Sequence, residues 1–110
     1  MAQQMTIDFR DIEGPIYSGR PRGESLRRKY ELDAVDTSPQ SVTVTVTVPS
    51  TTYSVTSSFF LGLFGPSVLA AGSRDAFFRR FQFSATPVLL DAFADYANRA
   101  LQTKSLFARH

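Results

Sequence analysis

Cysteine is absent from this chain of 110 residues, and its one histidine, His110, is the last residue. Without cysteine there is no disulfide, no thiolate metal ligand and no cysteine nucleophile. Chain ends are usually mobile, so His110 is poorly placed for a Ser-His-Asp relay or a histidine metal site. We therefore expect no catalytic residue, no metal and no cofactor. We also expect a cytoplasmic protein, because a sequence without cysteine fits that compartment.

A strong excess of one charge is also missing. The 12 basic and 10 acidic residues give a formal net charge of +2. Nucleic-acid-binding domains usually carry a larger and more clustered basic excess. The first residues, MAQQMTIDFRDIEG, lack the basic and then apolar plan of a signal peptide. The composition therefore favours neither nucleic acid nor membrane as a partner.

Charged residues are missing altogether over 41–73. The apolar part of this stretch, 55–72, is shorter than the roughly 20 residues that a membrane span needs. It predicts instead a helix over 57–72 that bends or restarts at Pro66, because proline lacks an amide hydrogen and clashes with the carbonyl of Gly62. Gly62 either relieves that clash or lets another backbone approach closely, and we favour the first explanation.

The segment SVTVTVTVP alternates valine and threonine, which predicts a strand over 42–48 with one apolar and one polar face. Strands with helices on both sides are usually apolar throughout, so the threonine face predicts a sheet that helices cover on one side. Alternation also predicts strands over 5–10 and 80–84. The expected fold class is α/β, a small single domain over 1–110 with a sheet of about three to five strands and helices packed mainly on one face.

Helices are predicted over 21–32, after Ser73 and over 86–102. Ser73 is a preferred residue type for capping a helix. The last helix has a proline at its first position and carries a continuous apolar stripe. Residues 102–110 are expected to form a C-terminal tail. The stripe consists of Leu89, Phe93, Tyr96, Ala97 and Ala100.

The helix over 57–72 lacks a charged outer face. A helix on one side of a sheet normally turns charged residues toward solvent. Phe59 and Leu63 can cover the valine face of the strand, but the other bulky side chains on the same turns cannot all point inward. Contiguous exposed apolar area usually marks a contact site. The candidate partner-binding residues are Phe59, Phe60, Leu61 and Phe64.

Thr56, Ser57 and Ser58 precede the phenylalanines at the start of this helix. One of these hydroxyls is expected to cap the helix, since serine and threonine accept a hydrogen bond from an otherwise unpaired amide there. One cap needs one hydroxyl, which leaves another for a different role. Ser57 and Ser58 are the candidate phosphorylation sites, because a helix N-terminus tolerates the added negative charge.

The segment 20–29 is rich in basic residues and contains one glutamate. It is either the solvated face of a helix, which is the usual place for charged residues, or a site for phosphate or an acidic partner. A domain that binds nucleic acid or an anionic ligand through this segment is the alternative to a protein-interaction module. The candidate anion-binding residues are Arg20, Arg22, Arg27 and Arg28.

From the strand over 42–48 to Thr56-Ser57-Ser58-Phe59, the sequence resembles STAS domains, the fold of anti-sigma-factor antagonists. In those domains a strand leads through a short loop to an Asp-Ser-Ser-Gly-Leu-Gly motif that opens a helix. The chain is similar above all to the STAS-like family of unknown function. That similarity covers most of the chain and lies in Gly19-Arg20, the strand over 42–48, Ser58-Phe59, Phe81-Gln82-Phe83 and the helix over 86–102.

The resemblance implies a STAS-like fold and a function in partner switching. In antagonist STAS domains a partner kinase phosphorylates the first serine of the motif, which by position is Ser57. The implied partner is a histidine-kinase-like ATPase or an anti-sigma-type kinase, and a homodimer is also considered. An enzyme is the competing class, but Asp91 and Asp95 are expected on an outward helix face with no histidine or cysteine beside them. We therefore expect a non-catalytic regulatory module.

Overall fold

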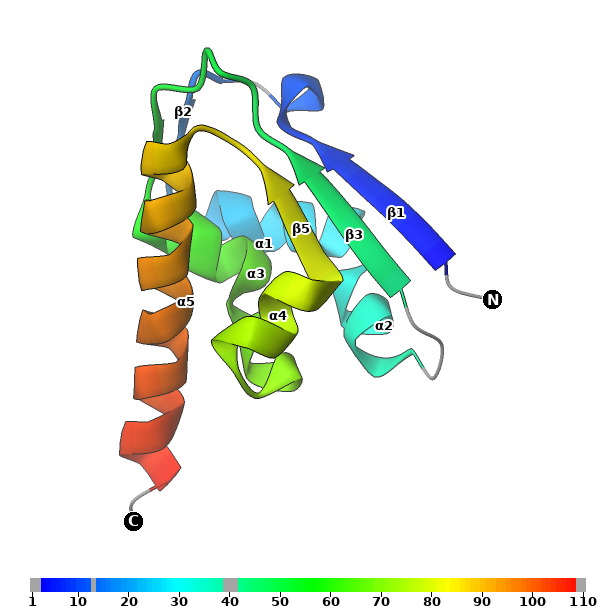
Figure 1. Ribbon diagram of the computed structural model, residues 1–110, viewed down its shortest axis with the longest axis vertical. Helices are drawn as coiled ribbons and strands as arrows, with labels where there is room; N and C mark the ends of the chain where they lie inside the picture. The colour runs from blue at the N-terminus through cyan, green and yellow to red at the C-terminus, as the bar shows by residue number, and fades with distance from the viewer. Residues whose placement is uncertain (1–2, 13, 39–41, 109–110) are drawn as a thin grey trace.

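Three parallel strands form the main sheet, in the order β1-β3-β5 (Figure 1). The computed structural model describes residues 3–12, 14–38 and 42–108. Parallel neighbours need crossover connections, and helices supply them here, so the chain forms a compact α/β domain as predicted. The strands are β1 (Gln3–Asp8), β3 (Val42–Thr47) and β5 (Phe81–Ser84).

Helices cover one face of this sheet, as the alternation of valine and threonine predicts (Figure 1). Val44 and Val46 of β3 are fully buried, whereas Thr45 between them is exposed. In the neighbouring strand, Ile7 lies beside Val46 and is buried with it. The prediction of a one-sided sheet is confirmed, and its open face carries polar side chains such as that of Thr45.

A second parallel pair of strands lies beside the main sheet and consists of β2 (Ile16–Tyr17) and β4 (Ser54–Val55). Beyond the strand ends, the amide of Thr56 donates to the carbonyl of Tyr17 at 2.9 Å. The hydroxyl of Tyr17 donates to the carbonyl of Phe9 at 2.9 Å, in the short 3-10 turn η1 (Phe9–Asp11). We call the pair of β2 and β4 the ribbon; each of its strands is followed by a helix, β2 by α1 (Arg20–Lys29) and β4 by α3 (Ser57–Ala71).

The helix predicted over 21–32 is divided in two. It consists of α1 (Arg20–Lys29) and α2 (Leu32–Thr37). Glu31 between them has a φ of 54°, in the left-handed region, so an α-helix cannot pass through it. The turn brings Leu32 into the core, where its side chain is fully buried. Helix α2 therefore extends to Thr37, beyond the predicted end at residue 32.

The uncharged stretch forms α3 (Ser57–Ala71), which contacts α1, α2, α4 and α5. Of the predicted bend or restart at Pro66, the restart does not occur, since the helix is continuous through that residue; it ends at Gly72, which has a φ of 86°. An apolar sequence around most of the circumference suits a helix that packs against several neighbours. Of the helices within the described residues, α3 included, none has both the length and the apolar content for crossing a bilayer.

Two glycines allow α1 and α3 to cross in direct backbone contact. A Cβ atom on Gly23 would clash with the carbonyl oxygen of Phe59, and one on Gly62 would clash with the carbonyl oxygen of Arg20. Both glycines are buried. Close approach by another backbone therefore explains Gly62, rather than the relief of Pro66 that we favoured, and the approaching backbone belongs to the same chain.

The remaining elements are α4 (Arg74–Arg80), β5 and α5 (Pro87–Ala108). Ser73 caps α4 as predicted, since its hydroxyl accepts a hydrogen bond from the amide of Ala76 at 3.1 Å. The last helix continues beyond Gln102 to Ala108, so most of the predicted tail is helical; Figure 1 shows this end extending past the rest of the molecule. The predicted stripe faces the core, with Leu89, Phe93, Ala97 and Ala100 buried and Tyr96 half-buried.

Candidate functional site

The start of α3 holds the hydroxyl groups that the sequence singles out. Thr56 is the cap: its side-chain oxygen accepts a hydrogen bond from the amide of Phe59 at 3.3 Å. Ser57 and Ser58 are the first two residues of the helix. Ser57 is half-buried and Ser58 is exposed. Capping thus uses a different hydroxyl, and Ser58 is the more accessible of the two candidate phosphorylation sites.

The carboxyl ends of β2 and β4 bring the first residues of α1 and α3 together. The two strands are parallel, with Tyr17 beside Val55 in the register. Gly19, with a φ of 91°, turns the chain from β2 into α1 without a side-chain cap. Positive helix ends and unpaired amides favour negative charge, so this end of the ribbon is electrostatically suited to a phosphorylated serine.

Arg22 lies close to the same place. Its guanidinium lies 5.4 Å from the ring centre of Tyr17 and 5.8 Å from that of Phe59, and it donates to the carbonyl of Ile16 at 3.2 Å. Stacking on aromatic rings holds an arginine in place while leaving its charge. Arg22 therefore adds positive charge beside the start of α3, although its role in the fold is to cover the rings.

The prediction of an exposed partner-binding surface on α3 is wrong. Phe59, Phe60 and Phe64 are at most 1% exposed, and Leu61 is only partly exposed. Phe60 stacks on Phe93 of α5 with ring centres 5.3 Å apart. The physical reason is the position of α3, which has α1 and α5 packed against it as well as the sheet, so its exposed side is limited to residues such as Pro66 and Leu69. These phenylalanines form the core of the protein.

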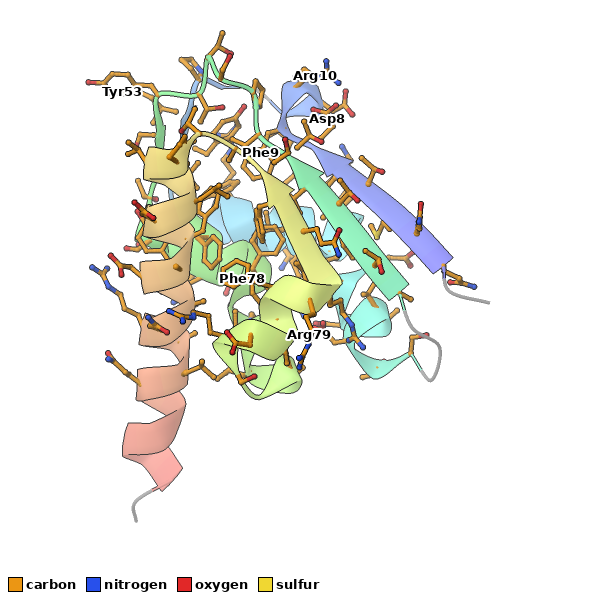
Figure 2. The ribbon with its side chains drawn as sticks, in the orientation of Figure 1. Asp8, Phe9, Arg10, Tyr53, Phe78 and Arg79 are labelled. Carbon is orange, nitrogen blue, oxygen red and sulfur yellow. The ribbon has the colours of Figure 1, made fainter. Side chains whose placement is uncertain are left out.

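Large apolar side chains are exposed instead at Ile16, Tyr53, Leu69, Val88 and Leu90, and the first two lie in neighbouring segments. Tyr53 is 81% exposed and Ile16 is 52% exposed. Their backbones are close in space, because Ile16 pairs with Ser54 and the amide of Tyr53 donates to the carbonyl of Pro15 at 2.9 Å. Figure 2 shows the Tyr53 side chain pointing away from the molecule. We call Ile16 and Tyr53 the ribbon surface. The sequence signal for this exposed position was Tyr53 itself, an aromatic residue in a segment rich in serine and threonine.

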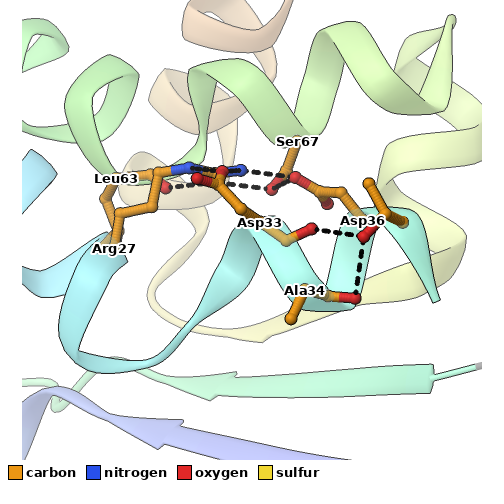
Figure 3. Close-up of polar contacts among 7 residues, drawn as sticks. Arg27, Asp33, Ala34, Asp36, Leu63 and Ser67 are labelled. Carbon is orange, nitrogen blue, oxygen red and sulfur yellow. Dashed lines mark hydrogen bonds and ion pairs between the residues drawn. The ribbon is translucent and has the colours of Figure 1, made fainter.

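Arg27 does not belong to an anion-binding surface, which corrects the prediction. Its side chain is 7% exposed and forms an ion pair with Asp36 at 2.5 Å (Figure 3). It also donates to Ser67 Oγ at 2.8 Å and to the carbonyl of Leu63 at 3.0 Å. A second carboxylate, from Asp33, lies 2.7 Å away. The donors of this guanidinium are used within the fold, where they hold α1, α2 and α3 together.

The other predicted anion-binding residues do not form a uniformly basic surface. Arg20 and Arg28 are exposed and line an open hollow of about 370 Å³ next to α1. Glu24 and Asp33 line the same hollow. The carboxylates of Glu24 and Asp33 offset the positive charge of Arg20 and Arg28, so the hollow does not favour an anion. Segment 20–29 is largely the solvated helix face that was the other interpretation.

Carboxylates elsewhere do not assemble a site. Asp91 and Asp95 are both exposed on α5, as predicted. In residues 3–12, 14–38 and 42–108, no group of three or more histidine, cysteine, aspartate or glutamate side chains is arranged to hold a metal ion. His110 lies outside the described residues. At the start of α3, by contrast, Ser58 is a predicted site residue with an accessible hydroxyl group.

Comparison with protein-family models, curated proteins and solved structures finds no match to this chain. Fold and site together describe a small α/β domain with a one-sided parallel sheet and an accessible serine at the start of α3.

Proposed function

We propose that this chain is a non-catalytic regulatory module that binds a protein partner and is controlled by phosphorylation of Ser58. The observation that carries the proposal is the accessibility of Ser58 at the second position of α3, with Thr56 serving as the cap. Ser57, the residue implied by resemblance to STAS domains, is half-buried. The neighbouring serine is therefore the better acceptor.

The ribbon surface supplies an apolar contact for the partner in place of the buried phenylalanines. Ile16 and Tyr53 are the exposed side chains there, and tyrosine is enriched where proteins bind one another. Ser58 follows β4 closely in the chain, so a charge on it acts near this contact. The partner class is the histidine-kinase-like ATPase that the resemblance implies, and the setting is the cytoplasm.

The modification transfers the γ-phosphoryl group of ATP to the Ser58 oxygen, with release of ADP and the hydroxyl proton. It adds a charge of about −1.5 to −2. The amides and dipole at the start of α3 stabilise that charge, so the fold is expected to remain intact. The same charge disfavours apolar docking on the ribbon surface, because the partner would have to desolvate it. Phosphorylation therefore releases the partner.

Three variants separate these effects. Ser58→Asp is expected to weaken partner binding at least about tenfold relative to Ser58→Ala, while raising the free energy of unfolding by about 0.3–1 kcal/mol at low salt. Ser25→Asp is the matched control, because Ser25 is also an exposed helical serine but lies within α1. That variant should bind like the unchanged protein.

Co-purification from the native cells, followed by titration and intact-mass measurement, provides the readouts. The proposal expects an ATPase of the histidine-kinase type that binds Ser58→Ala and not Ser58→Asp. It also expects a single added phosphate that maps to Ser58. Equal affinities for the two variants, or protein from these cells that carries no phosphate on Ser57 or Ser58 under any growth condition, would overturn it.

A further inference from the structure

β1 is an edge strand with β3 on one side only. Its 6 residues, Gln3–Asp8, pair with β3 in continuous register, so no bulge interrupts it. Unpaired amides and carbonyls on an edge invite another strand, and proteins usually prevent this with lysine, proline, a bulge or a covering element. β1 contains no lysine and no proline, and its outer side meets no strand of the described residues.

The charges of β1 favour a copy of itself as the added strand. Its one charged residue, Asp8, is at its end and is bound by Arg10, with Nη2 at 2.6 Å from Oδ2. When a strand pairs antiparallel with its own copy, its central residue lies opposite the same residue of the second copy. Like charges in that position destabilise the pair, so the uncharged centre of β1 is compatible with self-pairing.

A groove with both polar and apolar residues in its lining continues this edge on the helical side. It has a volume of about 400 Å³ and lies between β1 and the joint of α1 and α2. Met5, Tyr30 and Val35 are partly buried apolar side chains in its lining. Burial, with the nearby carboxylates of Asp11 and Asp8, raises the pKa of Tyr30, so its phenol stays neutral there. A second copy would cover this surface.

We propose that two copies of the chain pair through β1, antiparallel and centred on Thr6, to form one continuous sheet. A two-fold axis perpendicular to the sheet sets Thr6 opposite itself on the open face. Met5 then lies opposite Ile7 of the second copy on the helical face. Gln4 lies opposite Asp8, where its amide donates to the carboxylate. Both helical layers lie on the same side, and the groove beside Gln3, Gln4 and Met5 of each copy faces the carboxyl end of β1 in the other.

Charge substitutions at Thr6 test this arrangement, because Thr6 is exposed and the fold does not depend on it. Thr6→Lys and Thr6→Glu each place like charges opposite one another, which is expected to raise the dimer Kd at least about tenfold. An equimolar mixture of the two variants should recover dimers, as lysine then faces glutamate. The matched control is Thr45→Lys, since Thr45 pairs with Thr6 but lies on the exposed face of the central strand.

Sedimentation equilibrium and native mass spectrometry of the full chain give the readout. The proposal expects a dimer for the unchanged protein and for Thr45→Lys, monomers for each Thr6 variant, and heterodimers in the mixture. A monomer at all concentrations for the unchanged protein would overturn it. So would a Thr6→Lys chain that dimerises with unchanged Kd, because the copies would then meet through another surface.

Discussion

Arg27 and Asp36 form an ion pair in which an Nη2–Oδ2 distance of 2.5 Å joins two side chains that are each 7% exposed. Ser67 Oγ donates to the same carboxylate oxygen at 2.9 Å. The other oxygen, Oδ1 of Asp36, is buried without a hydrogen-bond partner among the described residues. The carboxylate of Asp36 therefore has two partners on one oxygen and none on the other.

Arg27→Ala is expected to lower the free energy of unfolding by about 3–5 kcal/mol, because it leaves the Asp36 carboxylate buried without its counter-charge. Urea unfolding followed by circular dichroism measures the change. Arg28→Ala is the control, since Arg28 is exposed on the same helix and its removal should cost less than about 0.5 kcal/mol. Equal losses for the two variants would mean that the buried pair contributes nothing specific.

Gly62→Ala is expected to destabilise the protein by about 1–3 kcal/mol, because the new methyl group forces α1 away from α3. The control is Gly65→Ala in the same helix, where the added Cβ meets Leu61 at ordinary distances of 3.7 and 3.8 Å. Its gain in helix propensity is opposed by crowding against Pro66, so the net change should stay within about 1 kcal/mol. Comparable thermal unfolding of the two variants would contradict the close helix crossing.

Thr56→Ala is expected to cost about 1 kcal/mol of stability, because the amide of Phe59 loses its hydrogen-bond acceptor at the helix start. Ser58→Ala should change the free energy of unfolding by less than about 0.5 kcal/mol, since Ser58 is exposed and the cap remains. Chemical unfolding curves of both variants give the comparison. A larger loss for Ser58→Ala would show that capping, rather than modification, explains this serine.

The pKa of Asp8 is held below its ordinary value of 3.8, first by hydrogen bonds from the Arg10 side chain and then by the Arg10 amide. A lowered pKa in the folded state stabilises the fold above the unfolded-state value, and this contribution is lost as the pH falls through the folded-state pKa. Carboxyl carbon shifts in an NMR titration should show the low value. Arg10→Ala should return it toward 3.8, whereas Arg79→Ala should leave it unchanged.

Burial on the two faces of β3 was predictable because the relevant pattern is local. Successive side chains of a strand point to opposite faces, so Val44, Thr45 and Val46 report directly which side is covered. The start of α3 was predictable for a similar reason, since a capping hydroxyl lies within the helix's own first turn. The division into α1 and α2 was not predictable from a local pattern, because it depends on the burial of Leu32 in the core.

The amino-acid sequence alone determined the one-sided sheet, the hydroxyl cap of α3 and the position of the last helix, all of which depend on residues near one another in the chain. Only the tertiary structure decided that Phe60 is core and that Arg27 is inside an ion-pair network. Their partners, Phe93 and Ser67, are far away in sequence, and no local period encodes such contacts. The same long-range packing buries the phenylalanines of α3, so the exposed apolar side chains lie elsewhere, Ile16 and Tyr53 among them.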